Sequence, residues 1–144
     1  MTDTTPTESN LSGLDRKDFQ KNINSRKTDL YILKNAQGME VAVTNYGCAI
    51  LSIMVPDKNG KFANVILGHD SIEHVINSPE PFLSTTIGRY GNRIANGKFT
   101  LYGEEHLLTV NNGPNSLHGG PTGFHARVWD AVQPNESTVI FNYT

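Results

Sequence analysis

Two glycine-rich segments carry the side chains that could recognise a ligand. The first, residues 87–99 (IGRYGNRIANGKF), holds Arg89, Asn92 and Arg93 among three glycines. Arginine offers five N–H donors in a rigid fork, and asparagine offers a donor and an acceptor together. Such a set suits a ligand covered in hydroxyl groups, although either arginine could instead brace neighbouring turns by bonding backbone carbonyls. The glycines do not follow the GxGxxG spacing, so a phosphate loop is not predicted.

The second segment, residues 111–120 (NNGPNSLHGG), places one histidine, His118, among three asparagines, three glycines and a proline. Asparagine, glycine and proline favour defined tight turns. Two roles for the histidine follow from this setting: its ring is presented to a ligand, or it is hydrogen bonded within its own loop. No second His or Cys lies at ligand spacing from His118, so a metal site is not predicted.

The other reactive side chains are better explained by structure than by chemistry. His69 and His74 could form a metal pair with Asp70, but a solvated helix start explains them better. Trp129 is expected in the core rather than against a ligand. Cys48 begins an apolar run and is expected to be a small buried hydrophobe rather than a reactive thiol. The sequence contains no GxSxG motif and no suggestive pair of carboxylates.

The charge and composition of the 144-residue chain exclude several classes of protein. The formal net charge is −2 and 18% of the residues are charged, so nothing indicates binding to nucleic acid. No apolar run is long enough to span a membrane, and the polar first residues lack the apolar centre of a signal peptide. We expect a cytoplasmic protein, and a secreted or periplasmic one stays open if a leader was removed.

The elements that must position these residues are mostly strands. Short apolar or alternating runs, bounded by Gly, Asn, Asp and Pro, predict an all-β fold, an antiparallel β-sandwich. Residues 49–56 (AILSIMVP) are apolar on both faces and predict a central strand. A turn at residues 57–60 is expected to lead to a return strand at residues 65–67, and another hairpin is expected to turn at residues 102–104. One helix is predicted within residues 70–80.

The sequence predicts one domain with a short lead-in. Residues 1–13 are rich in Thr, Ser and Pro and are expected to be a flexible N-terminal lead-in. Residues 14–144 are expected to form the β-sandwich. The last strand pattern, residues 137–144, stops without a cap or a polar tail. We therefore expect the chain to be part of something longer.

The two segments together resemble the aldose 1-epimerase (galactose mutarotase) family. The string GRYGNRIANGKF, followed by NNGPNSLHGGPTGFHARVW, is similar to the motif pair of that family. The resemblance runs from Lys27 to the last residue. It implies the large antiparallel sandwich called a supersandwich, here incomplete. It also implies interconversion of the α and β anomers of free aldohexoses such as galactose and glucose by acid/base ring opening, with no cofactor and no metal.

The resemblance assigns roles to three residues of this chain. Asn92 and Arg93 match the NR pair that contacts sugar hydroxyls, and His118 matches the histidine that binds the sugar near its reacting end and assists catalysis. Arg89 also matches a family position, but we interpret it as structural.

The family's second histidine, its C-terminal glutamate base and a sugar-binding aspartate are matched by no residue here. The resemblance thus implies the N-terminal portion of such a domain, inactive alone and partnered by a missing C-terminal half. A non-catalytic carbohydrate-binding module and a relative acting on sugar phosphates are the alternatives.

Overall fold

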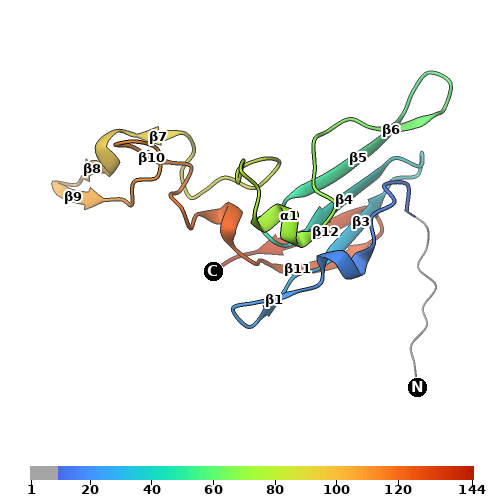
Figure 1. The fold of residues 1–144 in the computed structure, drawn as a ribbon, viewed down its shortest axis with the longest axis horizontal. Coiled ribbons are helices and arrows are strands. Elements are labelled where there is room, and N and C mark those ends of the chain that lie inside the picture. The colour runs from blue at the N-terminus through green and yellow to red at the C-terminus, as the bar shows by residue number, and fades with distance from the viewer. Residues whose placement is uncertain (1–9) are drawn as a thin grey trace.

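The largest sheet has four antiparallel strands in the order β3-β4-β5-β6. The computed structural model describes residues 10–144. The strands of this sheet are β3 (Leu30–Lys34), β4 (Glu40–Thr44), β5 (Ile50–Pro56) and β6 (Phe62–Asn64). Each is joined to the next by a short connection, as Figure 1 shows. The predicted strand at residues 49–56 is confirmed as an inner strand, because β5 pairs with β4 on one side and β6 on the other.

The return strand of the β5–β6 hairpin begins earlier than expected. The Asp57 carboxylate accepts the N–H groups of Asn59 and Lys61, and the Asp57 N–H donates to the Lys61 carbonyl at 2.8 Å. This closes the turn at Lys61, so pairing resumes with Phe62 opposite Pro56. The prediction of a strand at residues 65–67 was therefore wrong, and Val65 and Leu67 lie exposed beyond the strand.

One hydrophobic core lies between this sheet and two short helices. The helices are η1 (Arg16–Phe19), a 3-10 helix, and α1 (Ile72–Ile76). The buried side chains that pack together come from these helices, from β3–β5 and from the turn before β5: Phe19, Leu30, Ala42, Ala49, Leu51, Ile72 and Val75. The predicted helix at residues 70–80 is confirmed but is shorter. Ser71 caps it, since its side chain accepts the His74 N–H.

A second hairpin lies beside β3. It consists of β11 (Asp130–Asn135) and β12 (Thr138–Asn142). The Lys34 N–H donates to the Glu136 carbonyl at 2.8 Å, and the Tyr31 and Phe141 rings meet edge to face. A further small hairpin, β1 (Asn22–Ile23) with β2 (Arg26–Lys27), lies next to η1 (Figure 1).

One buried amide joins three of these segments. The Asn45 Oδ1 accepts the Asp29 N–H at 2.9 Å, and its Nδ2 donates to the carbonyls of Lys27 and Trp129 at 3.0 and 2.9 Å. Asn45 is only 4% exposed, so its hydrogen bonds replace contacts with water. This side chain therefore fixes the start of the β11–β12 hairpin against the first sheet.

Residues 1–9 of the expected lead-in lie outside the described residues. Its described part is tied to the sheet, because the N–H groups of Leu11 and Ser12 donate to the fully buried Glu40 carboxylate at 2.9 and 3.0 Å. The Lys34 ammonium group lies 3.8 Å from the same carboxylate. A buried carboxylate needs such hydrogen-bond donors, and the bonds that it accepts fix the backbone of residues 11 and 12 against the sheet.

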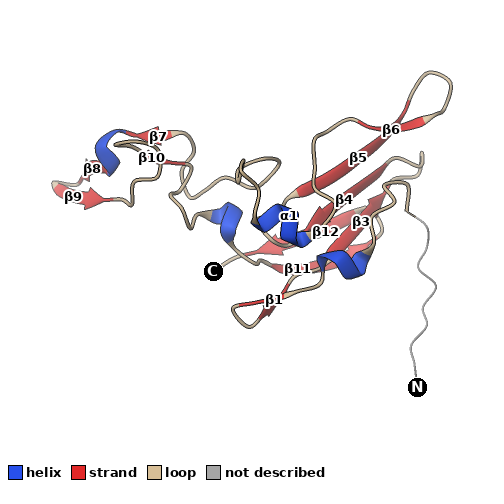
Figure 2. Ribbon diagram, in the orientation of Figure 1, coloured by secondary structure: helices blue, strands red, loops and turns tan. Residues whose placement is uncertain are grey.

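The segment formed by residues 88–123, which we call the arm, extends away from the rest of the described chain, the body (Figure 2). The arm contains β7 (Arg93–Ile94) paired with β10 (Ser116–Leu117), and β8 (Lys98–Leu101) paired with β9 (Glu104–Leu107). The 3-10 helix η2 (Ala95–Gly97) lies within the arm, and η3 (Phe124–Ala126) follows it. The hairpin predicted to turn at residues 102–104 is confirmed. The antiparallel all-β prediction is confirmed as well.

Candidate functional site

The two glycine-rich segments cross at the base of the arm, where there is no room for side chains. A Cβ added to Gly119 would lie 1.9 Å from the Gly88 carbonyl oxygen, and a Cβ on Gly88 would lie 2.2 Å from the Phe124 ring. The Gly88 carbonyl also accepts the Phe124 N–H at 3.0 Å. Glycine at these positions therefore lets residues 87–99 and 111–120 approach each other closely.

Close to this crossing in the sequence, Asn92 and His118 are joined by two reciprocal hydrogen bonds. The His118 N–H donates to the Asn92 carbonyl at 3.0 Å, and the Asn92 N–H donates to His118 Nδ1 at 2.9 Å. Both residues have positive φ, 59° and 54°, a conformation that few non-glycine residues adopt. The pairing of β7 with β10 places Arg93 opposite Leu117, and so next to His118.

The bond from Asn92 determines which nitrogen of the His118 ring carries hydrogen. Nδ1 acts as an acceptor, so in the neutral ring the proton resides on Nε2. The ring is half-buried. His118 therefore offers one N–H donor from Nε2, while its other nitrogen is already used by the backbone.

Arg93 is oriented by amide side chains rather than by a carboxylate. Its Nε donates to Asn112 Oδ1 at 2.8 Å, and one terminal nitrogen lies 3.5 Å from Asn92 Oδ1. None of the ion pairs formed within residues 10–144 includes Arg93. Arg93 is exposed, and its positive charge is not compensated by an ion pair.

The asparagines of the 111–120 loop explain its unusual composition. Asn111 bonds both backbone groups of Leu117: its Oδ1 accepts the N–H at 2.7 Å and its Nδ2 donates to the carbonyl at 3.1 Å. Asn112 and Asn115 bond each other through their backbones, at 3.1 and 3.0 Å. On the side of Leu117 that has no neighbouring strand, the amide side chain of Asn111 thus bonds the backbone as a strand would.

The structure links three of the four singled-out residues through Asn92 and places the fourth elsewhere. Asn92, Arg93 and His118 form one hydrogen-bonded cluster. The Arg89 guanidinium lies 5.3 Å from the centre of the Phe124 ring, a cation–π contact. This contact is with an aromatic ring rather than with the backbone carbonyls that the sequence suggested, and the structural role of Arg89 stays a prediction.

Two aromatic neighbours of the cluster were missed from the sequence. The Phe82 ring lies edge-on to the rings of both His118 and His125, with centroids 4.9 and 4.5 Å apart. His125 is 5% exposed and its Nδ1 has no hydrogen-bond partner. Burial lowers the pKa of His125, and the charges of His118 and Arg127 lower it further. No local pattern marks Phe82, because it follows a Pro-Glu-Pro stretch that indicates only a loop.

The remaining candidates have structural explanations. His74 Nδ1 lies 2.5 Å from Asp70 Oδ1, and both side chains are largely exposed at the start of α1. Residues 10–144 contain no group of three His, Cys, Asp or Glu side chains arranged to hold a metal ion. Burial raises the pKa of Cys48 to about 12, so its half-buried thiol stays protonated. No helix in the described part of the chain is long and apolar enough to cross a membrane.

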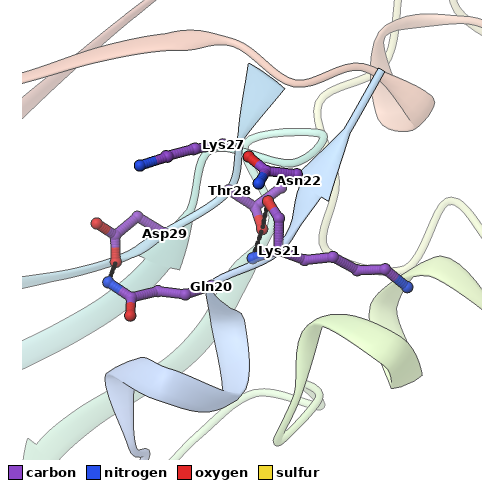
Figure 3. A pocket seen from close by; sticks show the side chains of 6 residues that line it. All are labelled: Gln20, Lys21, Asn22, Lys27, Thr28 and Asp29. Carbon is purple, nitrogen blue, oxygen red and sulfur yellow. Dashed lines mark hydrogen bonds between the residues drawn. The ribbon is translucent and has the colours of Figure 1, made fainter. Parts of the chain in front are cut away.

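A polar hollow in the body lies away from the arm, around the β1–β2 hairpin. It is lined by Gln20, Lys21, Asn22, Lys27, Thr28 and Asp29 (Figure 3). Its polar groups bond one another: Thr28 Oγ1 accepts the Lys21 N–H at 3.0 Å, and Gln20 donates to Asp29 at 3.2 Å. The side chains of Lys21 and Lys27 point in different directions. The hollow therefore has no converging charges that would hold an anion.

Comparisons with known proteins place this geometry in a family. A family model described as aldose 1-epimerase matches residues 29–144. The galactose mutarotase of Bos taurus is 43% identical over 91 residues, which is 63% of this chain and 26% of that protein. The aldose 1-epimerase of Escherichia coli K12 is 40% identical over 112 residues, which is 78% of this chain and 32% of that protein.

Solved structures agree with the sequence comparison. A GalM/aldose epimerase homologue from C. elegans superimposes with a TM-score of 0.74 at 33% identity, covering 79% of this chain and 35% of that one. A galactose 1-epimerase from Lactobacillus acidophilus gives a TM-score of 0.66 at 31% identity, covering 78% of this chain and 32% of the other. The chain thus spans about a third or less of the length of these relatives. Since the family model extends over most of the residues, the chain belongs to the aldose 1-epimerase family.

Proposed function

We propose that this chain binds a free aldohexose through Asn92, Arg93 and His118, and that it supplies the sugar-orienting part of an aldose 1-epimerase site. The observation that carries the proposal is the pair of hydrogen bonds between Asn92 and His118, which leaves the Nε2–H of the ring as a donor. The Arg93 guanidinium, which Asn112 orients, also reaches the Oδ1 of Asn92 at 3.5 Å. Directed N–H donors of this kind match the hydroxyl and ring oxygens of a pyranose.

The chemistry of anomer exchange needs few groups. A base removes the proton of the C1 hydroxyl while an acid supplies a proton to the ring oxygen, and the opened sugar closes again on the other face of its carbonyl. Nothing is oxidised and no group is transferred. The Nε2–H of His118 would donate a hydrogen bond to oxygen at the reacting end, and Arg93 would stabilise negative charge that develops there.

The same geometry limits what these three residues do. His118 Nδ1 accepts a backbone N–H, so the ring acts as a donor and does not take up the C1 proton there. Among residues 10–144, no carboxylate is hydrogen bonded or ion paired to Arg93 or His118. We infer that this cluster binds and polarises the sugar, while the base comes from another part of a complete site.

The test is a titration of the chain with galactose, followed by two-dimensional ¹H–¹⁵N NMR. We expect saturable shifts of the Asn92, Arg93 and His118 signals. His118→Gln and Arg93→Lys should each weaken binding about 10-fold or more, because each removes a directed donor. Lys98→Ala is the matched control, since Lys98 lies in the same arm and, within residues 10–144, its ammonium group bonds only Glu105.

Three outcomes would contradict the proposal. These are shifts confined to the body, equal responses to galactose and to galactitol, which has no anomeric carbon, and tighter binding of galactose 6-phosphate than of galactose. Polarimetry of α-galactose with the same sample should show little acceleration over buffer. Anomerisation at rates typical of enzymes would show that this chain carries its own base.

A further inference from the structure

We propose that Phe82 is a positioning residue for His118: its ring, held between two imidazoles, keeps the His118 ring in the orientation that aims Nε2–H outward. This inference deepens the proposed function and rests on it only for the consequence for sugar binding. The contact itself is the edge-to-face arrangement of the Phe82 and His118 rings, with centroids 4.9 Å apart and planes inclined by 66°.

The hydrogen bond to Nδ1 alone does not fix the ring. The Asn92 N–H restrains one edge of the imidazole, but a half-turn about the Cβ–Cγ bond would exchange Nδ1 for a carbon and move Nε2 to the other side. Packing against the face or edge of the ring is needed to oppose that rotation. Phe82 is the aromatic side chain that contacts this ring within residues 10–144.

Phe82 is itself supported from behind. His125 meets the Phe82 ring edge to face at 4.5 Å, and it is nearly completely buried. The Nδ1 of His125 has no hydrogen-bond partner, so packing rather than hydrogen bonding at that atom sets the position of this ring. Phe82 therefore lies between a fixed imidazole in the body and the imidazole presented by the arm.

The segment that carries Phe82 is anchored to the first sheet. The Ser84 carbonyl accepts the Ile50 N–H at 2.9 Å, and the Thr86 N–H donates to the Gly47 carbonyl at 2.8 Å. Since residues 84–86 are bonded to β5 and to the turn before it, the Phe82 ring is held within the body although it contacts the arm. Phe82 thereby restricts the rotation of the His118 ring against a fixed part of the body.

The experiment compares Phe82→Leu with Phe82→Tyr in the full chain, using long-range ¹H–¹⁵N NMR of the histidine rings. In the parent and in Phe82→Tyr, His118 should show a single ring state with Nδ1 bare and Nε2 protonated. In Phe82→Leu the two nitrogen signals should move toward each other, because flipped rings and the other tautomer become populated. Affinity for galactose should fall by about 3- to 10-fold in Phe82→Leu and be retained in Phe82→Tyr.

A matched control exists in the arm. Phe99 stacks on His106 with ring centroids 5.0 Å apart, so Phe99→Leu removes a comparable aromatic contact without touching His118. It should leave the His118 signals and the affinity for galactose unchanged. If Phe82→Leu does not fold, Phe82→Met replaces it, since methionine fills a similar volume without a ring.

Unchanged His118 nitrogen signals in a folded Phe82→Leu or Phe82→Met protein would overturn the inference. An equally large change of those signals in Phe99→Leu would overturn it too. The ring measurement needs no sugar. Failure of the parent to bind galactose would therefore reject the proposed function while the positioning role is still decided by the histidine signals.

Discussion

The body and the arm of this chain are built on different principles. The body buries a cluster of apolar side chains between a four-stranded sheet and two short helices. In the arm, every buried residue is a glycine or a serine: Gly88, Gly97, Ser116, Gly120 and Gly123. Its shape comes from backbone and amide hydrogen bonds around positive-φ residues. The candidate site lies in the part that buries no apolar side chain.

This difference separates stability from geometry. Burial of apolar surface supplies most of the free energy of folding, so the body is expected to stabilise the molecule as a whole. The arm depends on its attachment at the Gly88–Gly119 crossing and on the contact with Phe82. Substitutions in the two regions should consequently affect different measurements.

The largest expected effect is a test of the body core. Phe19→Ala removes a ring with no exposed surface and should lower the free energy of unfolding by about 3–5 kcal/mol. Leu101→Ala in the arm, where the side chain is 49% exposed, should cost less than about 1 kcal/mol. Urea unfolding followed by Trp129 fluorescence gives both values. Equal losses in the free energy of unfolding would show that side chains of the arm belong to the same hydrophobic core.

An intermediate effect is expected where the arm meets the body. Gly119→Ala forces a Cβ against the Gly88 carbonyl at a φ of +88°, whereas Gly113→Ala meets no atom at a φ of +57°. Gly113→Ala should therefore cost only backbone strain, about 1 kcal/mol. Gly119→Ala should cost about 2 kcal/mol or more, which corresponds to roughly 30-fold faster amide exchange.

Native-state hydrogen exchange locates that loss. In Gly119→Ala the faster exchange should appear at two amides. These are the amide of His118, which donates to Asn92 within the site, and the amide of Phe124, which donates to Gly88 at the crossing. The amides of β4 should keep their protection. If the β4 amides lose as much protection as His118, the crossing is part of the global folding unit and the separation of the two regions fails.

The smallest expected effect concerns pH. Burial, with the charges of His118 and Arg127, lowers the pKa of His125 below its ordinary value near 6.5. The unfolded chain therefore binds a proton at His125 at a higher pH than the folded chain does. The contribution of His125 to stability is full above about pH 6.5 and declines as the pH falls from there through the folded-state pKa.

The measurement is the free energy of unfolding between pH 7.5 and pH 4.5 for the parent and for His125→Phe. The parent should lose more stability on acidification than the variant does, because phenylalanine has no proton to bind. Parallel curves for the two proteins would show that His125 titrates alike in the folded and unfolded chains.

The strands of the body were largely predictable because their side-chain patterns repeat every two residues. Residues 49–56 were recognised as an inner strand because the run is apolar on both faces. The β6 strand was misplaced because the side chain of Asp57, rather than the apolar pattern, decides where the turn closes. Local hydrogen bonds likewise set the end of α1, because both the backbone N–H and the side-chain amide of Asn77 donate to the Glu73 carbonyl.

The residues of the candidate site were named through the resemblance to a known family, and their roles stay a prediction. Hydrogen bonds of Asn92 link His118 and Arg93 in the structure. The role of Nδ1 as an acceptor depends on the backbone of a residue 26 positions away, and no local pattern encodes it. Phe82 was missed for the same reason, since its partners come from residues far along the chain.

The amide of Asn45 gives the order of synthesis a physical meaning. Residues 19–75 hold the whole apolar cluster of the body, and they leave the ribosome before Trp129 exists. Until then the Asn45 N–H group that later donates to the Trp129 carbonyl must donate to water instead. Asn45 thus provides a hydrogen-bond donor that is in place before the β11–β12 strand pair is made.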